Sequence, residues 1–80
     1  MTSYLLCHRH TAPECRVVFA AWAGFVSPLR RRPAWASCLN GGHRLWWMVE
    51  AADEASALGH LPPYVAQRTE VVAVRPVTIP

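Results

Sequence analysis

The sequence has 80 residues, 52% of them hydrophobic, and a net charge of +3 that comes from eight arginines and no lysine. This length predicts a single domain, residues 1–80, with one small core. The charge excess is small and Arg30-Arg31-Arg32 is its only run, which argues against a nucleic-acid-binding protein. The longest weakly charged run, Val17 to Leu29, is too short for a membrane span, which needs about 20 residues.

The three cysteines are an odd number, and the first residues show no secretory signal pattern. We therefore expect a cytoplasmic protein with reduced thiols. The hydrophobic content, with four tryptophans, exceeds what one small core can bury. This excess predicts a homodimer.

The first predicted element is a strand near the N-terminus, Tyr4 to His10. Alternate residues of a strand face the same side, so His8 and His10 share a face with Tyr4 and Leu6. Both imidazoles are therefore expected on the more apolar face of the strand.

A helix is predicted next, from about Ala12 to Val26. Thr11 and Glu14 have the spacing of a capping box at its start, and Ser27-Pro28 would end it. Four large apolar residues would form one stripe on this helix: Val18, Trp22, Phe25 and Leu29.

The following segment predicts a β-hairpin. Strands Ala34–Leu39 and His43–Ala51 flank Asn40-Gly41, a dipeptide typical of a two-residue type I′ turn. The second of these strands carries large apolar groups on both faces, which indicates a central strand.

The remaining chain predicts a helix over Glu54–Leu61, a further turn over Tyr64–Arg68 and a last strand over Glu70–Ile79. Pro76 falls within that strand and cannot donate a hydrogen bond to a neighbour, so the strand is expected at an edge. The order of elements is β-α-β-β-α-β. This order predicts the ferredoxin-like α+β fold, an antiparallel four-stranded sheet of order 4-1-3-2 with two helices on one face.

Several phrases of the sequence resemble the small members of the dimeric α+β barrel superfamily. They are Ser27-Pro28-Leu29, Gly41-Gly42-His43, Trp47-Met48-Val49-Glu50-Ala51 followed by Asp53-Glu54-Ala55-Ser56-Ala57-Leu58, and Val74-Arg75-Pro76-Val77. The pattern is similar to that of YciI-like proteins, muconolactone-isomerase-like proteins, antibiotic-type monooxygenases and a nickel-binding uncharacterised family. The resemblance implies a dimer that forms through the open sheet faces.

The predicted topology brings four metal-binding side chains to one end of the sheet. His8 and His10 end the first strand beside the start of the third, at His43, and a two-residue loop would place Cys38 opposite His43 with Cβ atoms ~5 Å apart. Three imidazoles and one thiolate suit nickel, zinc or copper. The sequence therefore predicts a small metal-binding protein with these four ligands.

Three further residues bear on that prediction. Two of them are candidate extra ligands: Cys15, at the start of the first helix, and Glu70, at the start of the last strand. Cys15 could instead be a reactive thiol, because a helix N-terminus favours the thiolate, or a packed one. Cys7 lies on the opposite strand face and is predicted to be a core residue.

Two alternative functions fit the same sequence. One is a small isomerase- or monooxygenase-like enzyme, with one of the three clustered histidines as general base and Trp46 and Trp47 around a small apolar ligand. The other is a structural or interaction module in which the histidines are polar residues at a strand end and Cys38 is a small buried residue.

Overall fold

A computed structural model describes residues 1–80. Two long strands, β1 (Thr2–Arg9) and β3 (Arg44–Ala51), form the centre of a four-stranded sheet, with β4 (Thr69–Val74) beside β1 and β2 (Trp35–Ala36) beside β3. The order β2-β3-β1-β4 is the predicted order counted from the other edge, and every neighbouring pair is antiparallel. The expected α+β class, sheet order and central position of β3 are confirmed.

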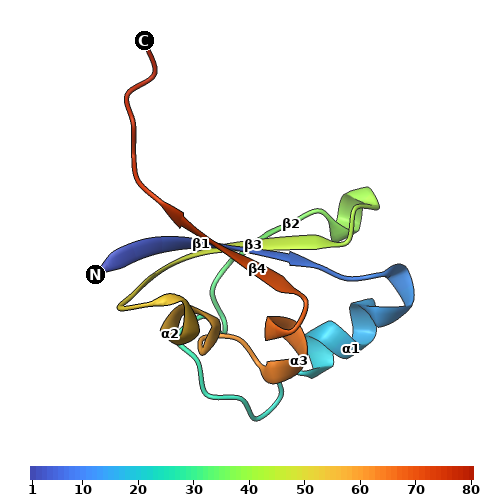
Figure 1. Cartoon of the computed structure of the whole chain (residues 1–80). Helices are drawn as coiled ribbons and strands as arrows, with labels where there is room; N and C mark the ends of the chain where they lie inside the picture. The colour runs from blue at the N-terminus through green and yellow to red at the C-terminus, as the bar shows by residue number, and fades with distance from the viewer.

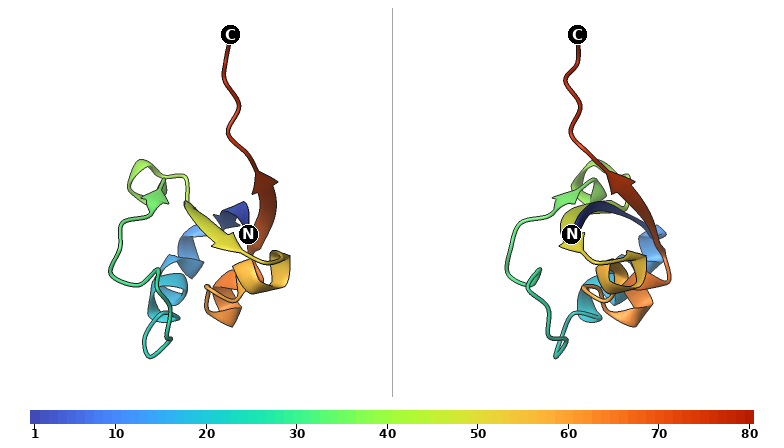
Figure 2. Two further views of the ribbon diagram at one scale, coloured as in Figure 1. Left: turned by 90° about the vertical axis from the view of Figure 1, so that its left-hand side faces the viewer. Right: turned by 60° about the vertical axis from the view of Figure 1, so that its left-hand side comes forward.

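Short helices lie on one side of this sheet (Figure 1). The helices are η1 (Ala12–Glu14), α1 (Cys15–Ala20), α2 (Glu54–Leu58) and α3 (Pro63–Ala66), and a further 3-10 turn, η2 (Cys38–Asn40), precedes β3. After β4 the last residues leave the body of the protein on the side away from these helices (Figure 2). No helix has the length and apolar character needed to cross a membrane.

The core fills the space between the sheet and the helices. Because side chains alternate along a strand, β1 and β3 each direct every second residue to the helical side. The buried apolar residues are Tyr4, Leu6, Val18, Leu45, Trp47, Val49, Ala51, Ala57, Leu61 and Val65. The two histidines of β1 lie on this same face, and His8 is only 1% exposed and His10 5%.

The first helix is much shorter than predicted. The backbone N–H of Thr11 donates to Glu14 Oε1 at 2.9 Å, so the start is as expected, but α1 ends at Ala20. Gly24 follows with a positive φ of 75°, a conformation that terminates helices at little cost only for glycine. Of the predicted stripe, only Val18 belongs to the helix.

The later boundaries also shift. The predicted helix Glu54–Leu61 ends at Leu58, and the predicted turn after it is α3. The last strand ends at Val74, so Pro76 lies beyond it, although the edge position of the strand is confirmed.

The predicted two-residue hairpin is wrong. Ser37, not Leu39, is the last residue to bond across the hairpin, and its N–H donates to the Arg44 carbonyl at 2.9 Å. The Ser37 carbonyl also accepts from Asn40 and Gly42 N–H at 2.9 and 2.8 Å, which winds the chain into η2. This turn replaces strand pairing beyond Ser37, so Cys38 lies in a 3-10 turn and is not paired with His43.

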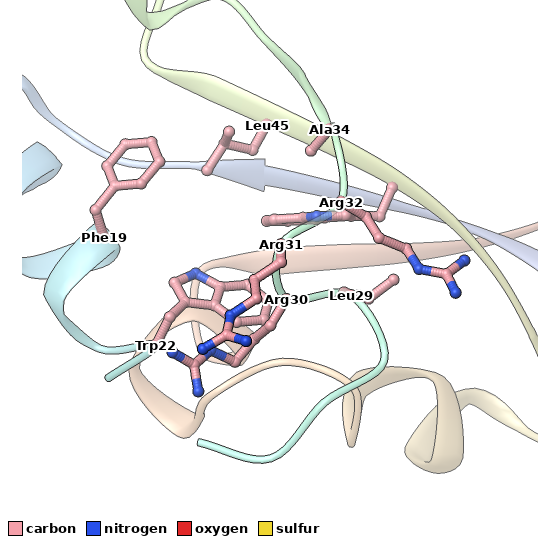
Figure 3. Close-up of a pocket in the computed structure, with 9 residues that line it drawn as sticks. Phe19, Trp22, Leu29, Arg30, Arg31, Arg32, Ala34 and Leu45 are labelled. Atoms are coloured by element: carbon pink, nitrogen blue, oxygen red, sulfur yellow. The ribbon is translucent and has the colours of Figure 1, made fainter. Parts of the chain in front are cut away.

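Residues 21–34, between α1 and β2, form a long loop that borders a cavity of about 260 Å³ on the helical side of the sheet (Figure 3). Trp22 and Leu29 reach from this loop to the core. The loop therefore replaces the second half of the predicted helix as a cover for Leu45 and Trp47.

Candidate metal centre

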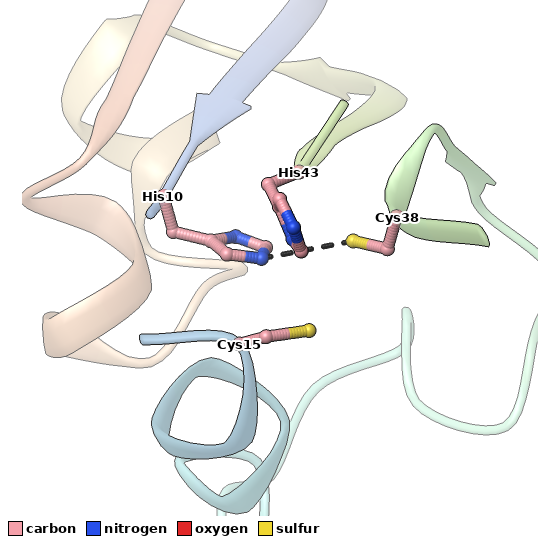
Figure 4. Close-up of side chains that lie close together, drawn as sticks. All are labelled: His10, Cys15, Cys38 and His43. Atoms are coloured by element: carbon pink, nitrogen blue, oxygen red, sulfur yellow. Dashed lines mark hydrogen bonds between the residues drawn. The ribbon is translucent and has the colours of Figure 1, made fainter. Parts of the chain in front are cut away.

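Four side chains from separate parts of the fold meet beside the C-terminal end of β1. His10 follows β1, Cys15 begins α1, Cys38 begins η2 and His43 immediately precedes β3. Each offers one nitrogen or sulfur atom, and these four atoms lie within 4.8 Å of one another. The four side chains point toward a common centre (Figure 4).

Hydrogen bonds behind the cluster fix the orientation of His10. The Nδ1 atom of His8 lies 3.2 Å from the Val65 carbonyl oxygen and 3.1 Å from the Thr69 hydroxyl oxygen. Thr69 donates its own hydrogen to the Val65 carbonyl at 2.7 Å, so both partners of His8 Nδ1 act as acceptors.

This arrangement determines which nitrogen of each neutral ring carries the hydrogen. His8 Nδ1 donates, so His8 Nε2 accepts, and its donor is His10 Nδ1 at 3.0 Å. The remaining His10 nitrogen, Nε2, therefore carries no hydrogen, and it accepts a hydrogen bond from the Cys38 thiol at 3.6 Å. A histidine whose second nitrogen is held this way is prepared for metal ligation.

Burial keeps both imidazoles neutral. It is the main cause that lowers the pKa of His8 and the pKa of His10 below the usual value for imidazole. The adjacent ring of His43 lowers the pKa of His10 further. Neutral imidazole is the form that binds a metal ion.

The Cys38 thiol disfavours ionisation without a positive partner. Burial raises the pKa of Cys38, and the neighbouring Cys15 raises it further because two adjacent thiolates repel each other. A divalent cation between the sulfurs would remove both penalties.

His43 is the residue of the cluster with a buried side-chain nitrogen that lacks a hydrogen bond. Its Nδ1 is buried and has no hydrogen-bond partner, and its backbone has a positive φ of 52°, which is rare for a residue with a side chain. A buried polar atom without a partner is costly. A bound metal would satisfy the imidazole that this strained backbone directs into the cluster.

Three of the four ligands predicted from the sequence lie in the cluster, and one does not. His10, Cys38 and His43 lie in the cluster, whereas His8 lies behind His10 and supports it through a hydrogen bond. Glu70 pairs with Cys7 across the strands, on the face of the sheet away from the cluster.

Cys15 completes the cluster, and the sequence carries a signal for it. His10 and Cys15 are separated by four residues, and so are Cys38 and His43, which gives two mirrored His/Cys pairs. Paired ligands at short, regular spacing are typical of structural zinc sites.

No family model, curated protein or solved structure matches this chain. The fold and the cluster define a small α+β protein with a His/Cys site that can hold a metal ion.

Proposed function

We propose that this chain is a metal-binding protein in which His10, Cys15, Cys38 and His43 hold one zinc ion. The observation that carries the proposal is the convergence of four donor atoms within 4.8 Å of one another. His10 is buried among them, and the buried Nδ1 of His43 has no hydrogen-bond partner. Donors around one tetrahedral zinc lie roughly 3.3–3.8 Å apart, given bond lengths of about 2.0–2.3 Å. Small side-chain rotations would bring the four donor atoms to this spacing.

The donor set favours zinc over the other two metals considered, nickel and copper. Two thiolates and two imidazoles are the donor set of a closed four-coordinate site of the structural zinc type. Such a site has no open position for a substrate or water, so a structural role is favoured over catalysis.

A bound ion would join α1 and η2, which make few contacts with the rest of the chain, to the ends of the central strands. The ligands come from the end of β1, the start of α1, η2 and the residue before β3, and only 13 of 80 residues are buried. Because small domains gain little stability from their cores, metal binding contributes directly to folding.

Titration of metal-free, reduced protein with Co²⁺ tests the site. We expect one equivalent to bind, with the absorption bands of tetrahedral cobalt and of thiolate-to-cobalt charge transfer, and Zn²⁺ to displace it. The variants Cys15→Ser and His43→Ala should lose most of this affinity, while the matched controls Cys7→Ser and His60→Ala should keep it. Equal titration curves for His43→Ala and His60→Ala would contradict the proposal.

We further propose that the fold is a divergent ferredoxin-like domain of the dimeric α+β barrel type, in a cytoplasmic protein. The element order and the sheet order β2-β3-β1-β4 support this assignment, as does an apolar sheet face without helices. A reducing compartment would also keep Cys15 and Cys38 available as ligands.

A further inference from the structure

The cavity under the loop of residues 21–34 is separate from the metal centre and shares none of its four ligands. Its volume is about 260 Å³, near the lower limit for small-molecule sites. Most of its wall is apolar, and the rings of Trp22 and Trp47 meet there at 5.7 Å between centroids, tilted by 47°. The two indoles contact each other and together form an angled apolar wall of the cavity.

Three consecutive arginines line the same cavity, Arg30, Arg31 and Arg32. No acidic residue lines it, and the one ion pair of the chain joins Arg68 to Glu14 elsewhere. The positive charge at the cavity is therefore not neutralised within the protein. Guanidinium groups bind carboxylates through paired, charge-assisted hydrogen bonds.

The backbone of this loop is strained where the arginines lie. Arg31 has a positive φ of 64°, which a residue with a side chain rarely adopts. Arg30 is held to the loop, since its Nη1 donates to the Phe25 carbonyl at 3.3 Å. Arg30 and Arg31 lie on the same side of the cavity as Trp22, and Arg32 extends in another direction (Figure 3).

From these observations we propose that the cavity binds a small, flat aromatic carboxylate. The apolar part of the ligand would lie against Trp22 and Trp47, and its carboxylate would accept paired hydrogen bonds from Arg31, while Arg32 adds positive charge at the cavity. The small volume limits the ligand to about two fused rings. Charge complementarity selects an anion over a neutral molecule of the same shape.

Binding of 2-naphthoate to the zinc-loaded protein tests this proposal, with its neutral analogue 2-naphthamide as the matched ligand. The indole N–H signals of the four tryptophans are followed by NMR. We expect naphthoate to shift the signals of Trp22 and Trp47 and to leave that of Trp35, which is outside the cavity. Naphthamide should bind about tenfold more weakly, because a neutral amide forms no ion pair with a guanidinium group.

The double variant Arg31→Gln/Arg32→Gln should weaken naphthoate binding about tenfold or more. Arg75→Gln, on the exposed C-terminal segment, should have no effect and serves as the matched control. Equal binding of naphthoate and naphthamide, equal affinity in the double variant, or the absence of shifts at millimolar ligand would overturn the proposal. Displacement of naphthoate by a lower concentration of a single-stranded oligonucleotide would also overturn it, in favour of nucleic acid.

Discussion

Individual hydrogen bonds give His8 and His10 different roles although they share one strand face. His8 Nδ1 donates to two acceptors, the Val65 carbonyl and the Thr69 hydroxyl oxygen. His8 Nε2 must therefore accept, and its donor is His10 Nδ1. His10 presents its other nitrogen, which carries no hydrogen, to the cluster. A residue behind a ligand commonly affects metal affinity by 10–100-fold.

Replacement of His8 by Phe tests this supporting role. The variant His8→Phe keeps all four proposed ligands but removes the acceptor for His10 Nδ1. We expect about 10–100-fold weaker zinc binding in a competition assay with a chelator, while the charge-transfer bands of the cobalt form persist. Affinity equal to that of wild type would show that His8 is only a packed core residue.

Glu14 contributes pH-dependent stability next to the cluster. Its carboxylate accepts hydrogen bonds from Thr11 N–H at 2.9 Å, Arg68 Nε at 2.9 Å and the Tyr64 hydroxyl at 3.1 Å. The Thr11 N–H, then Arg68, lower the pKa of Glu14 from 4.5 to about 2. A carboxylate with a depressed pKa stabilises the folded state above its unfolded value, and this stabilisation is lost as pH falls toward the folded value.

We therefore expect Glu14→Gln to lower the free energy of unfolding at pH 6, with a difference from wild type that shrinks between pH 4.5 and about pH 2. Urea denaturation of the metal-free proteins at several pH values measures this difference. The control is Glu54→Gln, in the exposed first turn of α2. A difference that stays constant across this pH range would contradict the assignment.

Among the elements, the turn between β2 and β3 has the largest effect on the metal centre, because it carries both Cys38 and His43. Ser37 holds it at both ends, since its hydroxyl accepts from Arg44 N–H at 3.0 Å and its carbonyl accepts from Gly42 N–H at 2.8 Å. A Cβ atom at Gly42 would lie only 2.4 Å from the Ser37 hydroxyl oxygen. Only glycine fits there without moving Ser37.

The variant Gly42→Ala should therefore weaken metal binding although it changes no ligand. The displaced Ser37 would alter the spacing of Cys38 and His43. We therefore expect about tenfold lower affinity for Co²⁺, similar to the effect of replacing residues that hold metal ligands in place. Gly24→Ala is the control: the positive φ of Gly24 makes alanine unfavourable there, but Gly24 lies far along the chain from the cluster, with no atom close to the new methyl group. An equal loss of affinity in both variants would indicate a general effect of destabilisation.

The strands could be predicted from the sequence, and the turns could not. The alternation of side chains places Leu6 and His8 on the buried face of β1, and it does not depend on the conformation of the turns. The buried face of the strand and the sheet order could therefore be predicted from the hydrophobic pattern and the order of elements. The end of α1 depends on the conformation of Gly24, and the hairpin depends on the bonds of Ser37. Such local competition leaves little trace in hydrophobic periodicity.

The candidate site was partly predictable for the same reason. The strand positions of His10 and His43 brought them to one end of the sheet. The role of Cys15 depends on how η1 turns the chain back over that end, which strand pattern alone does not show. His8 and His10 have the same pattern in sequence, and only the acceptors at Val65 and Thr69 distinguish them.

At the scale of the whole molecule, the sheet has two unequal faces. The helices cover one face, and the other presents cross-strand rows of mostly apolar residues. These residues are Leu5, Cys7, Trp35, Trp46, Met48 and Val72. Trp35 is 82% exposed and Met48 59%, which is a large contiguous apolar surface for a monomer.

We expect this face to form a two-fold dimer interface, in which each residue near the axis meets its own copy. Met48→Arg would place a charge on this apolar face beside Leu5 of β1, where a dimer would have to bury it. Sedimentation at micromolar concentration should show a dimer for wild type and a monomer for Met48→Arg. Val26→Arg, an equally drastic change at a 94% exposed loop position, should stay dimeric. A wild-type monomer, or a dimer unaffected by Met48→Arg, would show that the open face is not the interface.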